Sequence, residues 1–117
     1  MQQALIVGER IPAERVLEAR EAAGAMPRSW SPEVVPDAHP DGSSGGLAHC
    51  LVELEHEMER DRPAEVVIAD DSDAGLAATI VAAKLLIGVE AADQALGTGT
   101  VNARLISRLT ATYTPQG

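Results

Sequence analysis

The chain has 117 residues, of which 45% are hydrophobic, and this apolar content suits one modest core rather than several domains. Its 18 acidic and 9 basic residues give a formal net charge of −9, which opposes binding to nucleic-acid phosphates or to anionic lipid. Cys50 is the only cysteine, so no internal disulfide bond forms, and the sequence shows no signal peptide and no apolar run of membrane-spanning length. We therefore expect a cytoplasmic protein, one domain over residues 1–117, with no nucleic-acid or membrane partner.

The first predicted strand is a continuous apolar run, Ala4-Leu5-Ile6-Val7, that stops at Gly8. A run without polar alternation is typical of a strand buried on both faces of a parallel sheet. A helix is predicted next, from Pro12 to about Gly24, because proline favours the start of a helix and glycine the position after its end.

A loop and a long helix follow. Residues 26–46 are rich in proline and glycine, which predicts mostly loop, with residues 33–35 as the one strand that we expect in it. The helix after it ends before Pro63 and has an apolar stripe at helical spacing, formed by Leu47, Cys50, Leu51, Leu54 and Met58. Its opposite face carries His49, Glu53 and His56, but a solvated acidic face explains this spacing as well, and we predict no metal site there.

The most informative stretch is a strand, an acidic turn and a helix in succession. Val66-Val67-Ile68 predicts a buried strand, residues 70–73 (Asp-Asp-Ser-Asp) a polar turn with a helix cap, and residues 74–86 a helix. In an open parallel sheet, ligands bind in the crevice beyond the carboxyl ends of the strands. The acidic turn is therefore the first candidate for a functional site.

The remaining residues predict a fourth strand over 85–90, a helix over 100–109 and a fifth strand over 111–114. This alternation predicts an α/β fold, a three-layer Rossmann-like or flavodoxin-like sandwich of about five parallel strands in the order 2-1-3-4-5. The helix over 74–86 is apolar almost all round and needs neighbours on more than one side. We therefore expect a homodimer that buries this helix, the last helix with Val101 and Leu105, or an outer strand edge.

Three segments, in the correct order, resemble the first domain of the non-hydrolysing UDP-N-acetylglucosamine 2-epimerases. PAEVVIADDSDAGLAATIVAAKLLIGV is similar to that family's strand, Gly-Asp-Thr-Thr turn and alanine-rich helix. TVNARLISRLTATYTP is similar to a later helix with the pattern Asn-Arg-Arg-Leu, and ALIVGERIPAE is a looser match to a strand that ends in Gly-Thr-Arg-Pro-Glu. The resemblance spans most of the chain except residues 26–46. It implies one of the two Rossmann-like domains between which the family holds a UDP-sugar.

The resemblance also implies roles for particular residues. Asp71 stands where the family has the catalytic-site aspartate of Gly-Asp, and Glu90 where it has the glutamate of His-Val-Glu-Ala-Gly. The ligand-binding positions carried over in the same way are Gly8, Arg10, Ser72, Asn102 and Arg104. A UDP-sugar is the implied ligand, and the resemblance implies no cofactor and no metal.

The departures from the family pattern are as informative as the matches. Asp70 replaces the glycine of Gly-Asp, Gly88 stands in place of the histidine, and residues 99–100 (Gly-Thr) replace a second glutamate. The 117 residues resemble only the first domain, so we expect the second to be lacking, and an epimerase needs an acid/base pair as well as groups that stabilise the departing UDP. The first hypothesis is therefore a degenerate, non-catalytic domain that binds a ligand or a protein partner. The alternatives are an epimerase subunit completed by a dimer or a partner chain, and a small acidic receiver-like signalling domain.

Overall fold

The fold was obtained as a computed structural model that describes residues 3–32, 44–97 and 99–112. Four strands, β1 (Ala4–Val7), β2 (Arg28–Trp30), β3 (Glu65–Ile68) and β4 (Gly88–Ala91), alternate with four helices, α1 (Arg10–Ala22), α2 (Ser44–Arg60), α3 (Asp73–Lys84) and α4 (Val101–Thr112). Within the described ranges, no helix is long and apolar enough to cross a membrane.

The strands form one parallel sheet in the order β2-β1-β3-β4. The prediction that the first two apolar runs are adjacent central strands is confirmed, since Leu5 pairs with Val66 and Val7 with Ile68. The predicted number of five strands is wrong, because the described residues form four. Ala111 and Thr112, assigned to a fifth strand, continue α4 instead, and the rest of that strand lies outside the described residues.

The second strand is also not where the sequence analysis placed it. Residues 33–35 lie outside the described residues, and β2 is formed by Arg28, Ser29 and Trp30 within the stretch assigned mostly to loop. β2 is at the edge of the sheet, so it needs no continuous apolar run and gives only a weak sequence signal.

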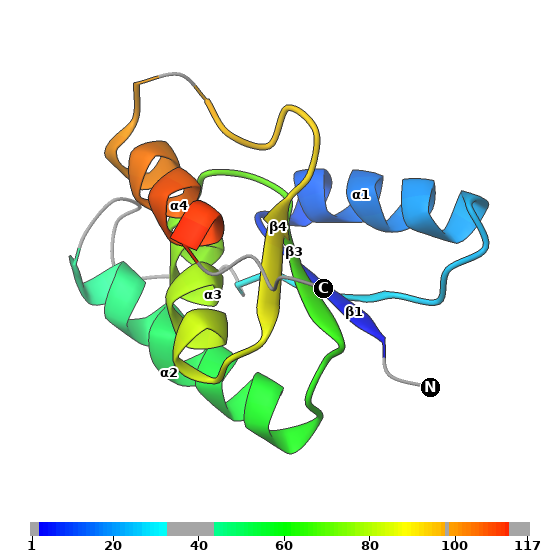
Figure 1. The fold of residues 1–117 in the computed structure, drawn as a ribbon, viewed down its shortest axis with the longest axis horizontal. Helices are drawn as coiled ribbons and strands as arrows, with labels where there is room; N and C mark the ends of the chain where they lie inside the picture. Colours follow the sequence, from blue (N-terminus) through cyan, green and yellow to red (C-terminus); the bar gives the residue numbers. More distant parts are fainter. Residues whose placement is uncertain (1–2, 33–43, 98, 113–117) are drawn as a thin grey trace.

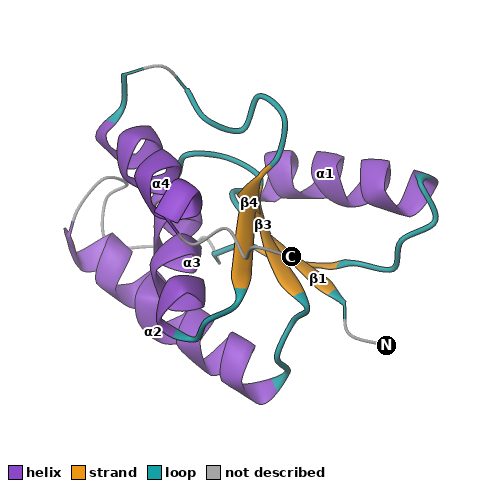
Figure 2. Ribbon diagram, viewed as in Figure 1, coloured by secondary structure: helices purple, strands orange, loops and turns teal. Residues whose placement is uncertain are grey.

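The two faces of the sheet are covered unequally, as Figures 1 and 2 show, with α1 on one side and α2, α3 and α4 on the other. The larger core cluster joins the second group of helices to Leu5, Val66 and Ile68 and includes the buried Cys50. The smaller cluster, on the α1 side, consists of Ile6, Ala13, Val67 and Ala69, with half-buried residues around it. Helices on both faces confirm the three-layer α/β sandwich.

α3 lies inside the larger layer, and ten of its twelve residues are buried. It packs against α2 and α4 as well as against β3 and β4. The neighbours required by its all-round apolar surface are therefore supplied within the chain, and this helix gives no reason for a dimer.

Both α1 and α3 end in a Schellman-type turn. At α1, Gly24 takes the left-handed conformation with φ 93°, as the glycine signal predicted, and the Ala25 N–H donates to the Arg20 carbonyl over 3.0 Å. At α3 the equivalent position is Leu86, with φ 61°, and the Ile87 N–H donates to the Ala82 carbonyl over 2.8 Å. This turn ends the helix two residues earlier than predicted and delays β4 to Gly88.

Replacing Leu86 with glycine should stabilise the protein. The leucine side chain is 78% exposed, so its loss sacrifices little packing, while relief of the left-handed backbone strain is worth about 1 kcal/mol. Urea unfolding followed by circular dichroism measures the change in the free energy of unfolding. Leu85→Gly is the matched control, because Leu85 has φ −90° and packs against the core, and it should destabilise the protein. A loss of stability in Leu86→Gly would contradict the strain argument.

Candidate functional site

The candidate site lies at the edge of the sheet where the carboxyl ends of the parallel strands meet. β1 ends at Val7, β3 at Ile68 and β4 at Ala91, and the pairing brings these ends together. The acidic turn over residues 70–73 therefore lies between the turn after β1 and the loop that joins β4 to α4.

Asp70 joins the turn after β1 to the acidic turn. Its Oδ2 accepts a hydrogen bond from the Glu9 N–H over 2.9 Å, and its Oδ1 accepts from the N–H and the hydroxyl of Ser72. A Cβ on Gly8 would lie 2.9 Å from the Ala69 Cβ and 3.1 Å from Asp70 Oδ1, so this approach requires glycine. Asp70 thus places a carboxylate of the chain itself at the start of α1, where a helix N-terminus attracts anions.

Ser72 caps α3, as the sequence predicted for this turn. Its backbone is extended, with φ −69° and ψ 170°, and its hydroxyl accepts a hydrogen bond from the Gly75 N–H over 3.3 Å. The first turn of α3 lies against the end of β3, since a Cβ on Gly75 would come within 2.3 Å of the Asp70 carbonyl oxygen.

Asp71 and Asp73 form hydrogen bonds with the segment between β4 and α4 and with the start of α4. Asp71 Oδ2 accepts hydrogen bonds from the Thr100 hydroxyl over 2.8 Å and from the Gly97 N–H over 3.3 Å. The Asn102 side-chain amide donates to the Asp71 carbonyl oxygen and to Asp73 Oδ1, each over 3.0 Å. The acidic turn therefore works as a connector, because its carboxylates accept hydrogen bonds from the segments on both sides.

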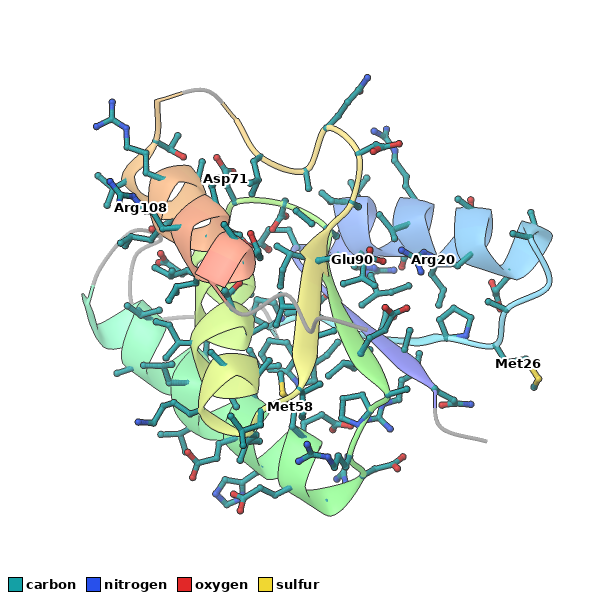
Figure 3. All side chains as sticks on the ribbon, in the orientation of Figure 1. Arg20, Met26, Met58, Asp71, Glu90 and Arg108 are labelled. Atoms are coloured by element: carbon teal, nitrogen blue, oxygen red, sulfur yellow. The ribbon has the colours of Figure 1, made fainter. Side chains whose placement is uncertain are left out.

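Glu90 has its hydrogen bond in a different place. It lies within β4, opposite Val67 of the α1-side cluster, and accepts a hydrogen bond from Arg20 of α1 over 2.6 Å (Figure 3). That hydrogen bond, together with the charges of Glu90 and Glu65, raises the pKa of Arg20 above its ordinary value despite the desolvation that opposes it. Among the described residues, no hydrogen bond or ion pair joins Glu90 to the acidic turn.

The other predicted site residues divide into two groups. Ser72 is part of the acidic turn, and the structure brings Gly8 and Asn102 to it. Arg10 lies at the start of α1 with a side chain that is 84% exposed, and it pairs with Glu14 over 3.2 Å. Arg104 lies on α4, beside a groove under the β4–α4 loop.

Sequence reasoning missed Thr100, Gly97 and Arg108. Thr100 had a readable signal, since a threonine before an apolar helical pattern is a typical cap, and its hydroxyl accepts from the Ala103 N–H over 3.0 Å. Arg108 follows Arg104 by four residues, a spacing that places both on one side of a helix. Nothing in the sequence pairs Gly97 with Asp71, because the loop geometry alone brings them together.

His49, Glu53 and His56 lie on the exposed surface of α2. Over residues 3–32, 44–97 and 99–112, no group of three or more histidine, cysteine, aspartate or glutamate side chains is placed to hold a metal ion.

No protein-family model and no curated protein matches the sequence. Among solved structures, the chain is similar to S. aureus MnaA in complex with UDP, at a TM-score of 0.74 and 14% identity over 93% of this chain and 36% of that one. It is also similar to UDP-GlcNAc 2-epimerase from Methanocaldococcus jannaschii, at a TM-score of 0.61 and 19% identity over 94% of this chain and 38% of that one.

The fold is therefore that of one part of the UDP-GlcNAc 2-epimerase structures, as the sequence resemblance predicted. The chain spans little more than a third of the length of either structure.

Proposed function

We propose that the chain is a ligand- or partner-binding domain of the epimerase fold that does not complete epimerisation by itself. The observation that carries the proposal is that the two predicted catalytic side chains form hydrogen bonds with different parts of the fold. Asp71 is hydrogen-bonded to Thr100 and Gly97, whereas Glu90 is bonded to Arg20 of α1. An acid/base pair has to reach one reacting carbon from both residues, and here each carboxylate is already engaged by a different segment of the chain.

The departures from the family pattern support the same proposal. Asp70 stands in place of the family's glycine, and its carboxylate accepts the Glu9 N–H at the start of α1. An incoming phosphate would compete with that carboxylate and be repelled by its charge. A UDP-sugar remains the proposed ligand, because the similar S. aureus structure was solved with UDP.

The test is to incubate the purified chain with UDP-N-acetylglucosamine and to follow the anomeric proton signals by NMR. We expect no conversion to the manno epimer, while calorimetry detects binding of the UDP-sugar. Asp71→Asn is the matched variant, since it keeps the shape of the side chain and removes its charge. Epimerisation by the wild type that is lost in Asp71→Asn would contradict the proposal and favour the alternative, an epimerase subunit completed by a dimer or a partner chain.

We further propose that the protein is a cytoplasmic homodimer. With α3 covered by its own chain, the support comes from α4, where Val101 is 70% and Leu105 44% exposed one helical turn apart. A second copy of the chain that covers these two side chains would remove their apolar surface from water. Light scattering should give a dimer mass for the wild type and a monomer mass for Leu105→Asp. A monomer mass for the wild type at micromolar concentration would contradict this proposal.

A further inference from the structure

A groove of about 560 Å³ lies between α4 and the loop that precedes it. One wall is a side of α4, and the other is formed by Leu96, Gly97 and Gly99 of the loop before it. The groove is lined by Leu96, Gly97, Gly99, Ala103, Arg104, Ser107, Arg108 and Ala111. Gly99 has φ 87°, and a Cβ there would meet nothing within 4 Å, so the loop side of the groove is open. Through Gly97, the groove adjoins the acidic turn.

The charge of this groove is opposite to that of the protein. Arg104 and Arg108 lie one helical turn apart on an exposed surface, in a chain whose net charge is −9. In the described part of the chain, Arg10, Arg20, Arg28 and Arg60 form ion pairs with carboxylates, whereas Arg104, like Arg15 and Arg62, forms none. Like charges at this spacing repel one another in the free helix, and an anion between them would remove the repulsion.

Asp71, whose carboxylate borders the groove, forms no ion pair with Arg104 in the described part of the chain. Asp71 Oδ2 accepts hydrogen bonds from the Thr100 hydroxyl and the Gly97 N–H, both neutral donors. Arginine presents a planar fork of donors that matches phosphate oxygens in pairs. Ser107, between the two arginines in sequence, adds a hydroxyl donor, and Leu96, Ala103 and Ala111 add apolar surface.

We propose that this groove binds the diphosphate of a small phosphorylated molecule of the nucleoside diphosphate class. Arg104 and Arg108 hold the phosphate oxygens, Ser107 donates a further hydrogen bond, and the apolar lining contacts the carbon part of the ligand. The inference deepens the proposed function, because it rests on a UDP-type ligand and assigns its phosphates to α4 rather than to Arg10. Arg108 and Ser107 are thereby new binding residues.

The test measures binding by calorimetry for inorganic pyrophosphate, UDP and uridine, and the rise in melting temperature that each ligand causes. We expect pyrophosphate and UDP to bind and to raise the melting temperature, more strongly at low than at high salt, and uridine to do neither. The double variant Arg104→Gln/Arg108→Gln should bind both anions at least about tenfold more weakly, since charged hydrogen bonds are removed. The control is Arg15→Gln/Lys84→Gln, which makes the same change in net charge outside the groove and should bind as the wild type does.

The outcomes separate this inference from the proposed function. The proposed diphosphate site is wrong if the double variant binds pyrophosphate as well as the wild type does. It is also wrong if the wild type does not bind pyrophosphate. If UDP-N-acetylglucosamine binds equally to the wild type and to the double variant, the groove is wrong and the UDP-sugar ligand stands. If pyrophosphate binds and is lost in the double variant while UDP-N-acetylglucosamine does not bind, the groove stands and the UDP-sugar ligand is wrong.

Discussion

Replacing Gly75 with alanine should destabilise the protein by about 3 kcal/mol, at the upper end of the usual cost of overpacking a core. The added methyl group would lie 2.3 Å from the Asp70 carbonyl oxygen and 3.1 Å from the Ile68 side chain. The first of these contacts is with backbone of the turn that follows β3, which cannot rotate away as a side chain can. The change in the free energy of unfolding is measured by urea titration followed by circular dichroism.

Gly24→Ala is the control for this substitution. Gly24 has φ 93°, so alanine there is strained, but a Cβ would meet nothing within 4 Å. Its expected cost is about 1 kcal/mol, from the backbone conformation alone. Equal losses of stability in the two variants would show that the close approach of α3 to β3 contributes nothing.

Removing the side chain of Asp70 should cost about 2 kcal/mol, because hydrogen bonds to a charged group are lost on both sides of the turn. In Asp70→Ala, the Glu9 N–H and the Ser72 hydroxyl both lose their acceptor. The same urea titration gives the change in stability, and amide NMR should show shifted signals for Glu9 and Ser72.

Asp70→Asn separates the charge from the shape of this side chain. The amide keeps one acceptor oxygen and replaces the other by a donor, so it can serve only one of the two sides. We expect roughly half the loss seen in Asp70→Ala. A fully stable Asp70→Ala would contradict the role of Asp70 as the link between the β1 and β3 turns.

The parts of the fold that the sequence predicted well are those with strong local signals. β1 and β3 are continuous apolar runs, α2 has a regular stripe, and Gly24 marks the end of α1. β2 was misplaced because an edge strand needs no apolar run. β4 was predicted too early because Leu85-Leu86-Ile87 is apolar, although Leu86 takes a left-handed turn that no propensity for leucine predicts.

For the candidate site too, some features could be predicted from local sequence pattern and others could not. The acidic turn, its position at the carboxyl ends of the strands and a helix cap from either Ser72 or Asp73 follow from local pattern and from the parallel sheet. The partners of each carboxylate do not, because they come from distant residues: Arg20 lies 70 positions from Glu90, and Thr100 lies 29 from Asp71. Such pairings depend on loop paths and side-chain rotamers, which no local pattern in one sequence determines.

The unequal covering of the sheet has a consequence for how the molecule opens. Detaching α1 exposes only the small cluster around Ile6 and Val67 and breaks the ion pairs of Arg20, whose side chain is 32% exposed. Partly exposed pairs of this kind are worth roughly 0–1 kcal/mol each. Detaching α3 would instead disrupt the larger cluster, because α3 packs against α2, against α4 and against the sheet. We therefore expect local opening to begin with α1 separating from the sheet, while the α2–α3–α4 side stays folded.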